Sequence, residues 1–193
     1  MTSILEVEQL DTLSSNASST LTIGGTNTTT IAFGPNVTTT PSSLAMTPAF
    51  YAYASGATTI SDDTWTKVSI GTELFDTNSN YDTSTSRFSP SIAGKYFFTA
   101  TIFANANLVG QLREVYLALY KNGTNHTMLS EENLNSGFDE YRRTATGAAV
   151  DTANGTSDYY EIYTYINNTS NSPAYSGSGV KGIKFGAYRI IGT

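Results

Sequence analysis

Residues 76–98 read DTNSNYDTSTSRFSPSIAGKYFF, and this stretch carries more information about the fold than any other. Residues 81–82 and the polar residues after them are typical of a turn that leads into a strand at residues 87–88. The segment 90–94 begins with proline and ends with glycine, which predicts a second bend. Tyr96 and Phe98 then share one side of an alternating run, so the returning chain is predicted to be a strand with a buried face.

Further short strands separated by turn signals are predicted on both sides of this stretch. Residues 95–105 alternate strictly, so Tyr96 and every second residue after it share one apolar face. Asn122 and Gly123 predict a tight hairpin turn. The other strands are expected at residues 49–53, 65–70, 113–121, 141–150, 159–166 and 182–191. Many short strands at this spacing, without a helix of ordinary length, predict an all-β antiparallel sandwich or jelly roll.

The composition differs between two parts of the chain. The 193 residues suffice for one well-buried domain with an appendage. Hydrophobic residues make up 39% of the chain, whereas charged residues make up only 13%, about half the usual share. Ser, Thr, Asn and Gly dominate residues 1–45, and the single Trp, all the Tyr and nearly all the Phe come later. We therefore expect an N-terminal arm or stalk at residues 1–45 and a head domain at residues 46–193.

The N-terminal region has too little apolar surface to fold alone. Its first residues fit either a helical stripe or a short strand, and residues 20–23 and 30–33 fit two short strands separated by glycine-rich turns. We interpret the region as an anchoring arm that packs on a neighbour, the alternative being a flexible leader. The apolar anchoring candidates are Leu5, Val7, Leu10, Leu21, Ile23, Ile31 and Phe33.

Several predicted strands carry large residues on both faces. In residues 159–166, three tyrosines lie on one face of the predicted strand, and Tyr160 and two isoleucines lie on the other. One face of a monomeric sandwich is usually polar, so a second aromatic face favours a partner, most simply another copy. The alternative is a set of scattered exposed tyrosines. The candidates for a trimer interface are Tyr116, Tyr159, Tyr163, Tyr165, Phe97 and Phe103.

Charge and cysteine usage exclude several classes of function. The net charge of −6 and the pI of about 4.6 oppose nucleic-acid binding, because a phosphate backbone would be repelled. The absence of cysteine excludes disulfides and thiolate zinc sites, and it favours assembly in a reducing cell. No apolar run is long enough for a membrane span, and the N-terminus lacks the pattern of a signal peptide.

Catalytic and metal-binding patterns are weak, so we expect no enzyme and no bound cofactor other than calcium. The sole histidine, His126, is expected at a hairpin tip, with nothing in the sequence to place an orienting carboxylate beside it. Calcium is the favoured ion because it accepts several loop oxygens as ligands. Its candidate ligands are Asp62, Asp63, Asp76 and Asp82, the alternative being solvated turn aspartates.

The stretch quoted first resembles the globular head of complement component one-q and its tumour-necrosis-factor-like relatives. The residues that match the family pattern are Asp76, Tyr81, Phe88, Gly94, Tyr96 and Phe98. Ile70 and Ala100 depart from it, while residues 117–123 and 185–190 resemble the family's central strand and turn and its closing strand. Over residues 46–193, the resemblance implies a ten-stranded jelly roll that assembles as a tight trimer, and some members of the family look calcium-dependent.

Residues 20–34 resemble segments of fibre and surface proteins from phages and large algal viruses. Combined with a trimeric head, this resemblance implies a virion decoration protein, spike or head fibre, located at the virion surface after assembly in the host cytoplasm. The arm would bind the major capsid protein or another virion protein, and the head would contribute to host attachment through a surface glycan or receptor. The alternative is a soluble carbohydrate- or receptor-binding module that uses loops near Asp62, residues 135–137 and residues 171–179.

Overall fold

The computed structural model describes residues 46–106, 108–134, 140–169, 174–175 and 182–191. The chain divides into two units, Met1–Thr39 and Thr40–Thr193, and every described residue belongs to the second. The predicted arm and its seven apolar candidates therefore lie outside the described residues, as do the loops at residues 135–137 and most of 171–179.

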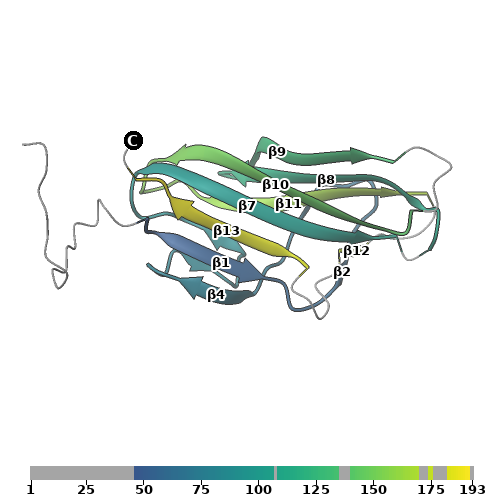
Figure 1. Ribbon diagram of the computed structural model, residues 1–193, viewed down its shortest axis with the longest axis horizontal. Helices are drawn as coiled ribbons and strands as arrows, with labels where there is room; N and C mark the ends of the chain where they lie inside the picture. The colour runs from purple at the N-terminus through teal and green to yellow at the C-terminus, as the bar shows by residue number, and fades with distance from the viewer. Residues whose placement is uncertain (1–45, 107, 135–139, 170–173, 176–181, 192–193) are drawn as a thin grey trace, which may run out of the picture. The chain divides into compact units, whose positions relative to one another are not determined.

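The described residues form two antiparallel sheets that pack face to face, with no helix among them (Figure 1). We call the sheet that contains the longest strands sheet A and the other sheet B. Sheet A has the order β2-β12-β7-β13-β1-β4, with β10 paired to β7. Its strands are β1 (Ala49–Tyr53), β2 (Thr58–Thr59), β4 (Thr72–Asp76), β7 (Gly94–Asn105), β10 (Arg142–Ala153), β12 (Ala174–Tyr175) and β13 (Lys184–Arg189).

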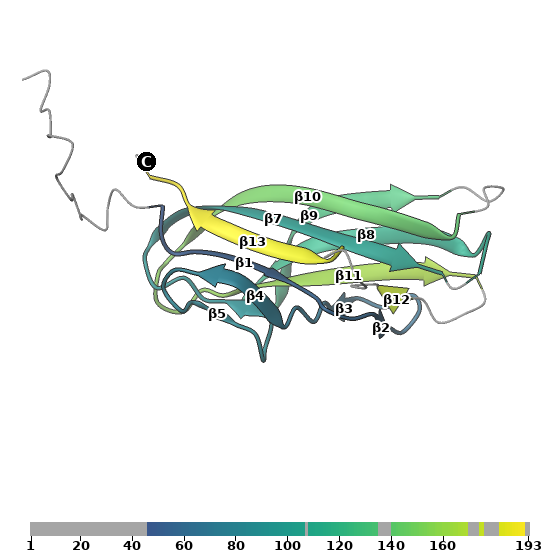
Figure 2. The same ribbon diagram turned by 60° about the horizontal axis from the view of Figure 1, so that its bottom comes forward.

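Sheet B has the order β5-β6-β11-β8-β9, with β3 paired to β11. Its strands are β3 (Thr66–Lys67), β5 (Tyr81–Asp82), β6 (Arg87–Phe88), β8 (Leu112–Lys121), β9 (Thr124–Asn133) and β11 (Tyr160–Asn168). Figure 2 shows β11 and β8 behind β7 and β13, in the second layer. This is the predicted all-β jelly-roll sandwich, and the prediction is confirmed.

The core lies between the sheets and is rich in aromatic side chains. Phe98 of β7 packs against Tyr160 of β11 with 4.4 Å between ring centroids, and Phe50 stacks on Tyr81 and Phe88 at 4.5 Å each. These five residues are at most 5% exposed. Aromatic pairs at such distances stabilise a core beyond the effect of buried area alone, so the family-like aromatic positions are the main packing residues.

The stretch at residues 76–98 folds as two turns that are held by its own side chains. The carboxylate of Asp76 accepts a hydrogen bond from the Tyr81 amide at 2.7 Å, which closes the first turn. The Tyr81 hydroxyl donates to the Ile70 carbonyl at 2.7 Å, and burial raises the pKa of this hydroxyl. The predicted strand at residues 87–88 is β6, and the predicted return strand is β7.

Five strands, β2, β4, β5, β9 and β12, were not predicted, and one predicted strand is much shorter. Of the strand expected at residues 65–70, only β3 is regular strand, and the Val68 amide after it still donates to the Ile162 carbonyl of β11 at 2.9 Å. Strand β9 is mostly exposed or half-buried along its length, so it lacks the apolar alternation that indicates a strand. Pairing with β8 therefore accounts for β9 better than its own sequence does.

Candidate functional site

The outer face of sheet A is unusually apolar. Alternation places Phe97, Tyr188 and Val150 on this face, next to one another through the registers of β7 with β13 and with β10. Their exposure is notable, since Val150 is 56% and Tyr188 41% exposed. Tyr51 and the 51% exposed Phe75 extend the patch over β1 and β4, with 6.5 Å between their ring centroids. We call these five residues the sheet A patch.

The outer face across β10, β7 and β13 carries few charged residues. Lys95 lies at one end and Arg142 at the other, and Lys184 of β13 lies opposite Thr101, in the middle of β7. The other outward positions between the two ends hold threonine, alanine, valine, glycine and aromatic residues. A face with few charges and many aromatic residues has the composition of the buried part of a protein interface.

The outer face of sheet B carries a different group of rings, which we call the sheet B cluster. It consists of Trp65, Tyr116, Tyr120, Tyr163 and Tyr165. The cross-strand pair formed by Tyr120 and Tyr163 stacks at 3.8 Å between centroids, and the pair formed by Tyr116 and Tyr165 stacks at 5.2 Å. All five side chains are half-buried, so each ring is held by its neighbours and still reaches solvent.

Trp65 lies over the middle of the sheet B cluster. Its ring centroid is 6.3 Å from that of Tyr116, 6.1 Å from that of Tyr120 and 5.7 Å from that of Tyr165. Ala118 shares the outward side of β8 with the two tyrosines on either side of it, yet it is completely buried. We infer that the indole covers Ala118, where a larger side chain would displace it.

A buried ion pair lies next to the sheet B cluster. Glu161 is 3% exposed, and its carboxylate accepts from Lys67 at 2.6 Å and from Arg87 at 3.0 Å. Arg87 also lies over the ring of Tyr159, with 3.7 Å from its Cζ atom to the centroid. Two cations therefore neutralise the one carboxylate, which satisfies the requirement that a buried charge be paired.

The six candidates for a trimer interface do not come together on one surface. Tyr116, Tyr163 and Tyr165 belong to the sheet B cluster, and Tyr159 lies beside it under Arg87. Phe97 and Phe103 point outward from sheet A, on the opposite side of the sandwich. The trimer assignment itself stays a prediction, but its residues divide into two surfaces with different chemistry.

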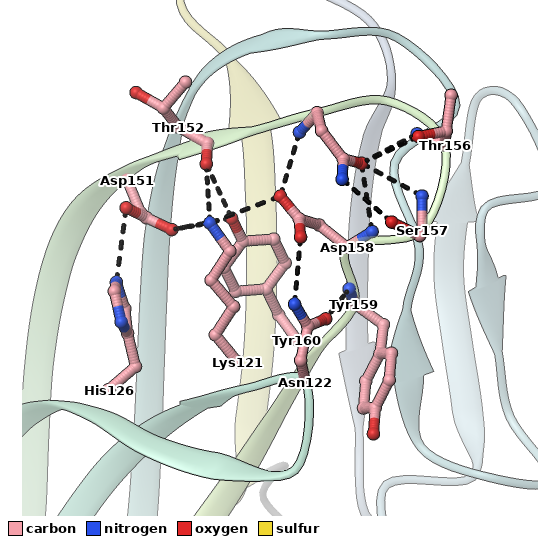
Figure 3. A network of polar contacts seen from close by, with 11 residues as sticks. Lys121, Asn122, His126, Asp151, Thr152, Thr156, Ser157, Asp158, Tyr159 and Tyr160 are labelled. Atoms are coloured by element: carbon pink, nitrogen blue, oxygen red, sulfur yellow. Dashed lines mark hydrogen bonds and ion pairs between the residues drawn. The ribbon is translucent and has the colours of Figure 1, made fainter.

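A polar network joins the β8–β9 hairpin turn to the loop between β10 and β11 (Figure 3). The Lys121 ammonium is 2.9 Å from the carboxylate of Asp151 and 3.3 Å from that of Asp158. The Tyr160 hydroxyl donates to Asp151 at 2.7 Å, and the side chain of Asn122 donates to Asp158 at 2.9 Å. The network thus fixes the end of the sandwich with groups from four segments.

Mutual pairing changes the pKa values in this network. Burial works against ionisation of Asp151, but hydrogen bonds from Lys121 and Tyr160 outweigh it and lower its pKa to about 2. The pKa of Tyr160 is raised, first by burial and then by the neighbouring Asp151. Burial likewise opposes the charge of Lys121, yet its two carboxylate partners raise its pKa. All three groups are therefore held in the charge states that stabilise the fold.

His126 has a carboxylate beside it, which was not expected from the sequence. Its Nε2 atom is 3.2 Å from Oδ1 of Asp151. Asp151 lies on β10, so the pair depends on the approach of β9 to β10 and could not be read from local sequence. No hydrogen bond joins His126 to a serine or threonine hydroxyl in the part of the chain that the structure describes. The arrangement accordingly lacks the nucleophile of a catalytic triad.

The four aspartates proposed for calcium each stabilise a turn or a strand end. Asp62 accepts from the Asn168 amide at 2.7 Å, and Asp63 accepts from the Tyr165 hydroxyl. Asp76 caps its turn as described above, and Asp82 accepts from Ser84 and Thr85 in the next one. No group of three or more metal-ligating residues occurs among the described residues, so calcium binding stays a prediction without structural support.

Residues 49–178 match the family model of the C1q domain. The chain belongs to the C1q domain family. This confirms the resemblance drawn from residues 76–98 at the level of the family, and a C1q domain fits a recognition module. Among the described residues of this C1q-domain protein, no helix is long and apolar enough to cross a membrane.

Solved structures agree with this assignment of the fold. The globular domain of zebrafish complement 1qA protein is 16% identical, with a TM-score of 0.50, and the match covers 76% of this chain and 98% of that one. Eiger TNF from S. frugiperda is 12% identical, also with a TM-score of 0.50, over 75% of this chain and 93% of its own. No curated protein matches the chain. At these identities the structures show the fold alone.

Sequence reasoning missed the central residues of the sheet B cluster. The outward tyrosines of β11 follow from simple alternation, and they were predicted to lie together. The position of Trp65 depends on the pairing of Lys67 with Tyr163, which are far apart in the chain. The only available signals were the presence of a single tryptophan and the small residue Ala118 between two tyrosines.

Proposed function

We propose that the protein is a recognition module that assembles as a homotrimer through the sheet A patch. The observation that carries this proposal is the exposure of Phe75, Val150 and Tyr188 on a face with few charges. Contiguous exposed apolar surface on a soluble protein marks a contact site. The assembly would present three heads together and so raise the avidity of each for its ligand.

Sheet A is preferred to sheet B for self-association because the two faces differ in charge. The sheet B face carries Glu114, Glu131 and the Glu161 ion pairs, whereas the outward charged residues of β10, β7 and β13 on sheet A are only Lys95, Arg142 and Lys184, outside the sheet A patch. Charged residues are depleted in the buried part of an interface, and unpaired charges there oppose association. Phe97 and Phe103 therefore remain candidates for the trimer contact.

The finer proposal is that the trimer decorates a virion, as a capsid decoration protein, spike or head fibre with a part in host attachment. Its support is the polar, glycine-rich N-terminal region, which precedes the head and resembles segments of viral fibre proteins. That region would bind the major capsid or another virion protein. Mass spectrometry of gradient-purified particles is expected to find peptides of this chain, and their presence only in the particle-free fraction would contradict the location.

Light scattering of the full chain tests the assembly. We expect a mass of about 62 kDa, three times the 20.7 kDa of one chain, and the same stoichiometry for residues 46–193. Val150→Asp and Tyr188→Asp each place a charge in the sheet A patch without disturbing the core, so each is expected to weaken association at least about a hundredfold.

Met128→Asp is the matched control, because Met128 is 40% exposed on sheet B. It is expected to leave the mass unchanged. A full-length protein that is monomeric at micromolar concentration, or a trimer that is indifferent to both sheet A substitutions, would refute the proposal.

A further inference from the structure

Self-association through sheet A leaves the sheet B cluster without a role. We propose that this cluster binds a basic segment of a partner protein, one that presents arginine or lysine side chains. The inference rests on the proposed function only in that the copies cover sheet A and leave sheet B open to a ligand.

The rings of the cluster are already ordered in the free protein. The Trp65 ring is held by the rings of Tyr116, Tyr120 and Tyr165 around it. The Tyr116 hydroxyl donates to Asn133 at 2.8 Å, which fixes its ring further. Binding to such a surface orders few additional side chains, so little of the interaction energy is lost to conformational entropy.

Carboxylates surround one end of the cluster. Glu131 lies directly across from Tyr116 in the pairing of β8 with β9. Glu114 lies one step along the same face, between Asn167 and Asn133 of the neighbouring strands. The carboxylate of Asp63 lies beside Tyr165 and accepts a hydrogen bond from its hydroxyl.

These three carboxylates differ from the other acidic groups near the cluster. Glu161 is paired with two cations, whereas none of Asp63, Glu114 and Glu131 forms an ion pair with a lysine or arginine within the described ranges. Burial is the largest cause that raises the pKa of Tyr116, and the nearby charges of Glu114 and Glu131 raise it further. The acidic end of the cluster therefore presents negative charge without an internal counter-ion.

Aromatic rings next to unpaired carboxylates select a cationic ligand. A guanidinium or ammonium group is attracted to the face of an indole or phenol ring and forms charge-assisted hydrogen bonds with a carboxylate. Arginine can do both at once because its planar group stacks and donates in one arrangement. The net charge of −6 adds long-range attraction for a basic partner and repels an anionic one.

The single tryptophan makes the surface directly observable. Trp65 is the only tryptophan in the chain, so its emission reports on the centre of the cluster. We would titrate the full chain with a ten-residue peptide of alternating arginine and glycine, and in parallel with a peptide in which uncharged citrulline replaces each arginine. A saturable change of emission is expected with the arginine peptide, with affinity at least tenfold weaker for the citrulline peptide and falling as salt is raised.

Removal of the carboxylate charges should weaken the complex without changing the rings. Glu131→Gln is expected to weaken arginine-peptide binding roughly fivefold, and Glu114→Gln with Glu131→Gln roughly twentyfold. Glu73→Gln is the matched control because Glu73 is exposed on β4 of sheet A, and it should leave the affinity unchanged. Circular dichroism identifies any variant that fails to fold. If the double variant fails to fold, the single Glu131→Gln variant decides the test, because the Glu131 side chain is exposed.

Three results would overturn the inference: equal affinity for the two peptides, no response of Trp65 to either, or a response to neutral maltohexaose alone. Light scattering of the same samples separates this inference from the proposed function. A trimer that does not bind the arginine peptide refutes the ligand assignment alone. A monomer that binds it refutes the self-association alone.

Discussion

At the scale of single residues, Gly147 shows how closely β9 and β10 approach along one side of the sandwich. A Cβ atom at this position would lie 2.1 Å from the carbonyl oxygen of Leu129, which belongs to the backbone of β9. Backbone cannot move aside as the end of a side chain can. The two sheets are therefore joined at this side through a contact that only glycine permits.

Gly147→Ala is expected to destabilise the head by about 2 kcal/mol or more, since either β9 or β10 has to shift. Urea unfolding followed by circular dichroism measures the change. Gly56→Ala is the control because a Cβ atom there would meet nothing within 4 Å, and its effect should stay within about 0.5 kcal/mol. Equal stability of the two variants would contradict the close approach of the strands.

Asp151 provides a prediction for acid pH. Its pKa is lowered from 3.8 to about 2 in the folded protein, so its stabilising effect is fully present above pH 4 and is lost as the pH falls toward 2. Asp151→Asn should cost about 1–2 kcal/mol at pH 7, and the difference from the unmodified protein should shrink between pH 4 and pH 2.

Urea unfolding at pH 7, 4 and 2 checks this expectation. The exposed Glu73 offers a control, because Glu73→Gln removes a carboxylate that makes no ion pair with another described residue. A difference between Asp151→Asn and the unmodified protein that stays constant across this range would mean that Lys121 and Tyr160 do not favour the ionised carboxylate.

At the scale of elements, the turn of the β8–β9 hairpin has the backbone that its sequence predicts. Asn122 has a φ of 54° and Gly123 a φ of 79°, which is the left-handed pair predicted from the sequence. The side chain of Asn122 also accepts from the Tyr159 amide at 3.0 Å and donates to Asp158. The turn therefore holds the polar network as well as the hairpin.

Asn122→Ala is expected to destabilise the head by about 1–2 kcal/mol, because alanine tolerates positive φ poorly, removes the acceptor of the Tyr159 amide and removes one donor to Asp158. Asn125→Ala is the matched control, since the side-chain hydrogen bond that Asn125 makes to a described residue is a weak one to the sulfur of Met128. Thermal unfolding of the two variants gives the comparison. A larger loss from Asn125→Ala would show that the strands, and not the turn, fix the hairpin.

Elements with an apolar face could be predicted from the sequence, and those defined by their neighbours could not. The alternation at residues 95–105 gave β7 and its buried side correctly, because every second residue contacts the core. Strand β9 has no such pattern, since its pairing with β8 is its main contact. For the candidate site, alternation predicted which tyrosines of β11 face outward, but it could not reveal that Phe97 and Phe103 lie on the other sheet.

At the scale of the whole molecule, the sandwich has two outer faces with distinct roles in our proposal. The sheet A patch has few charges and is contiguous, whereas the sheet B cluster is aromatic, ordered and acidic. Association through one face and recognition through the other requires no rearrangement of the core. Assembly should therefore stabilise the folded state by mass action.

The melting temperature is accordingly expected to depend on protein concentration. Between 1 and 100 µM chain, a folded trimer in equilibrium with unfolded chains should gain a few degrees in Tm, as measured by differential scanning fluorimetry. Val150→Asp should abolish the dependence, because it removes the association. A Tm that is identical at both concentrations for the unmodified protein would contradict assembly in this range.

The position of β1 within sheet A has a mechanical consequence. The strand lies between β13 and β4 and is the first described strand of the chain. Any tension that enters through the residues before Ala49 is directed along β1, against hydrogen bonds on both of its edges. Those bonds are then loaded together in shear instead of opening one after another, so a head held by its N-terminal side would resist detachment under flow or during collision with a cell.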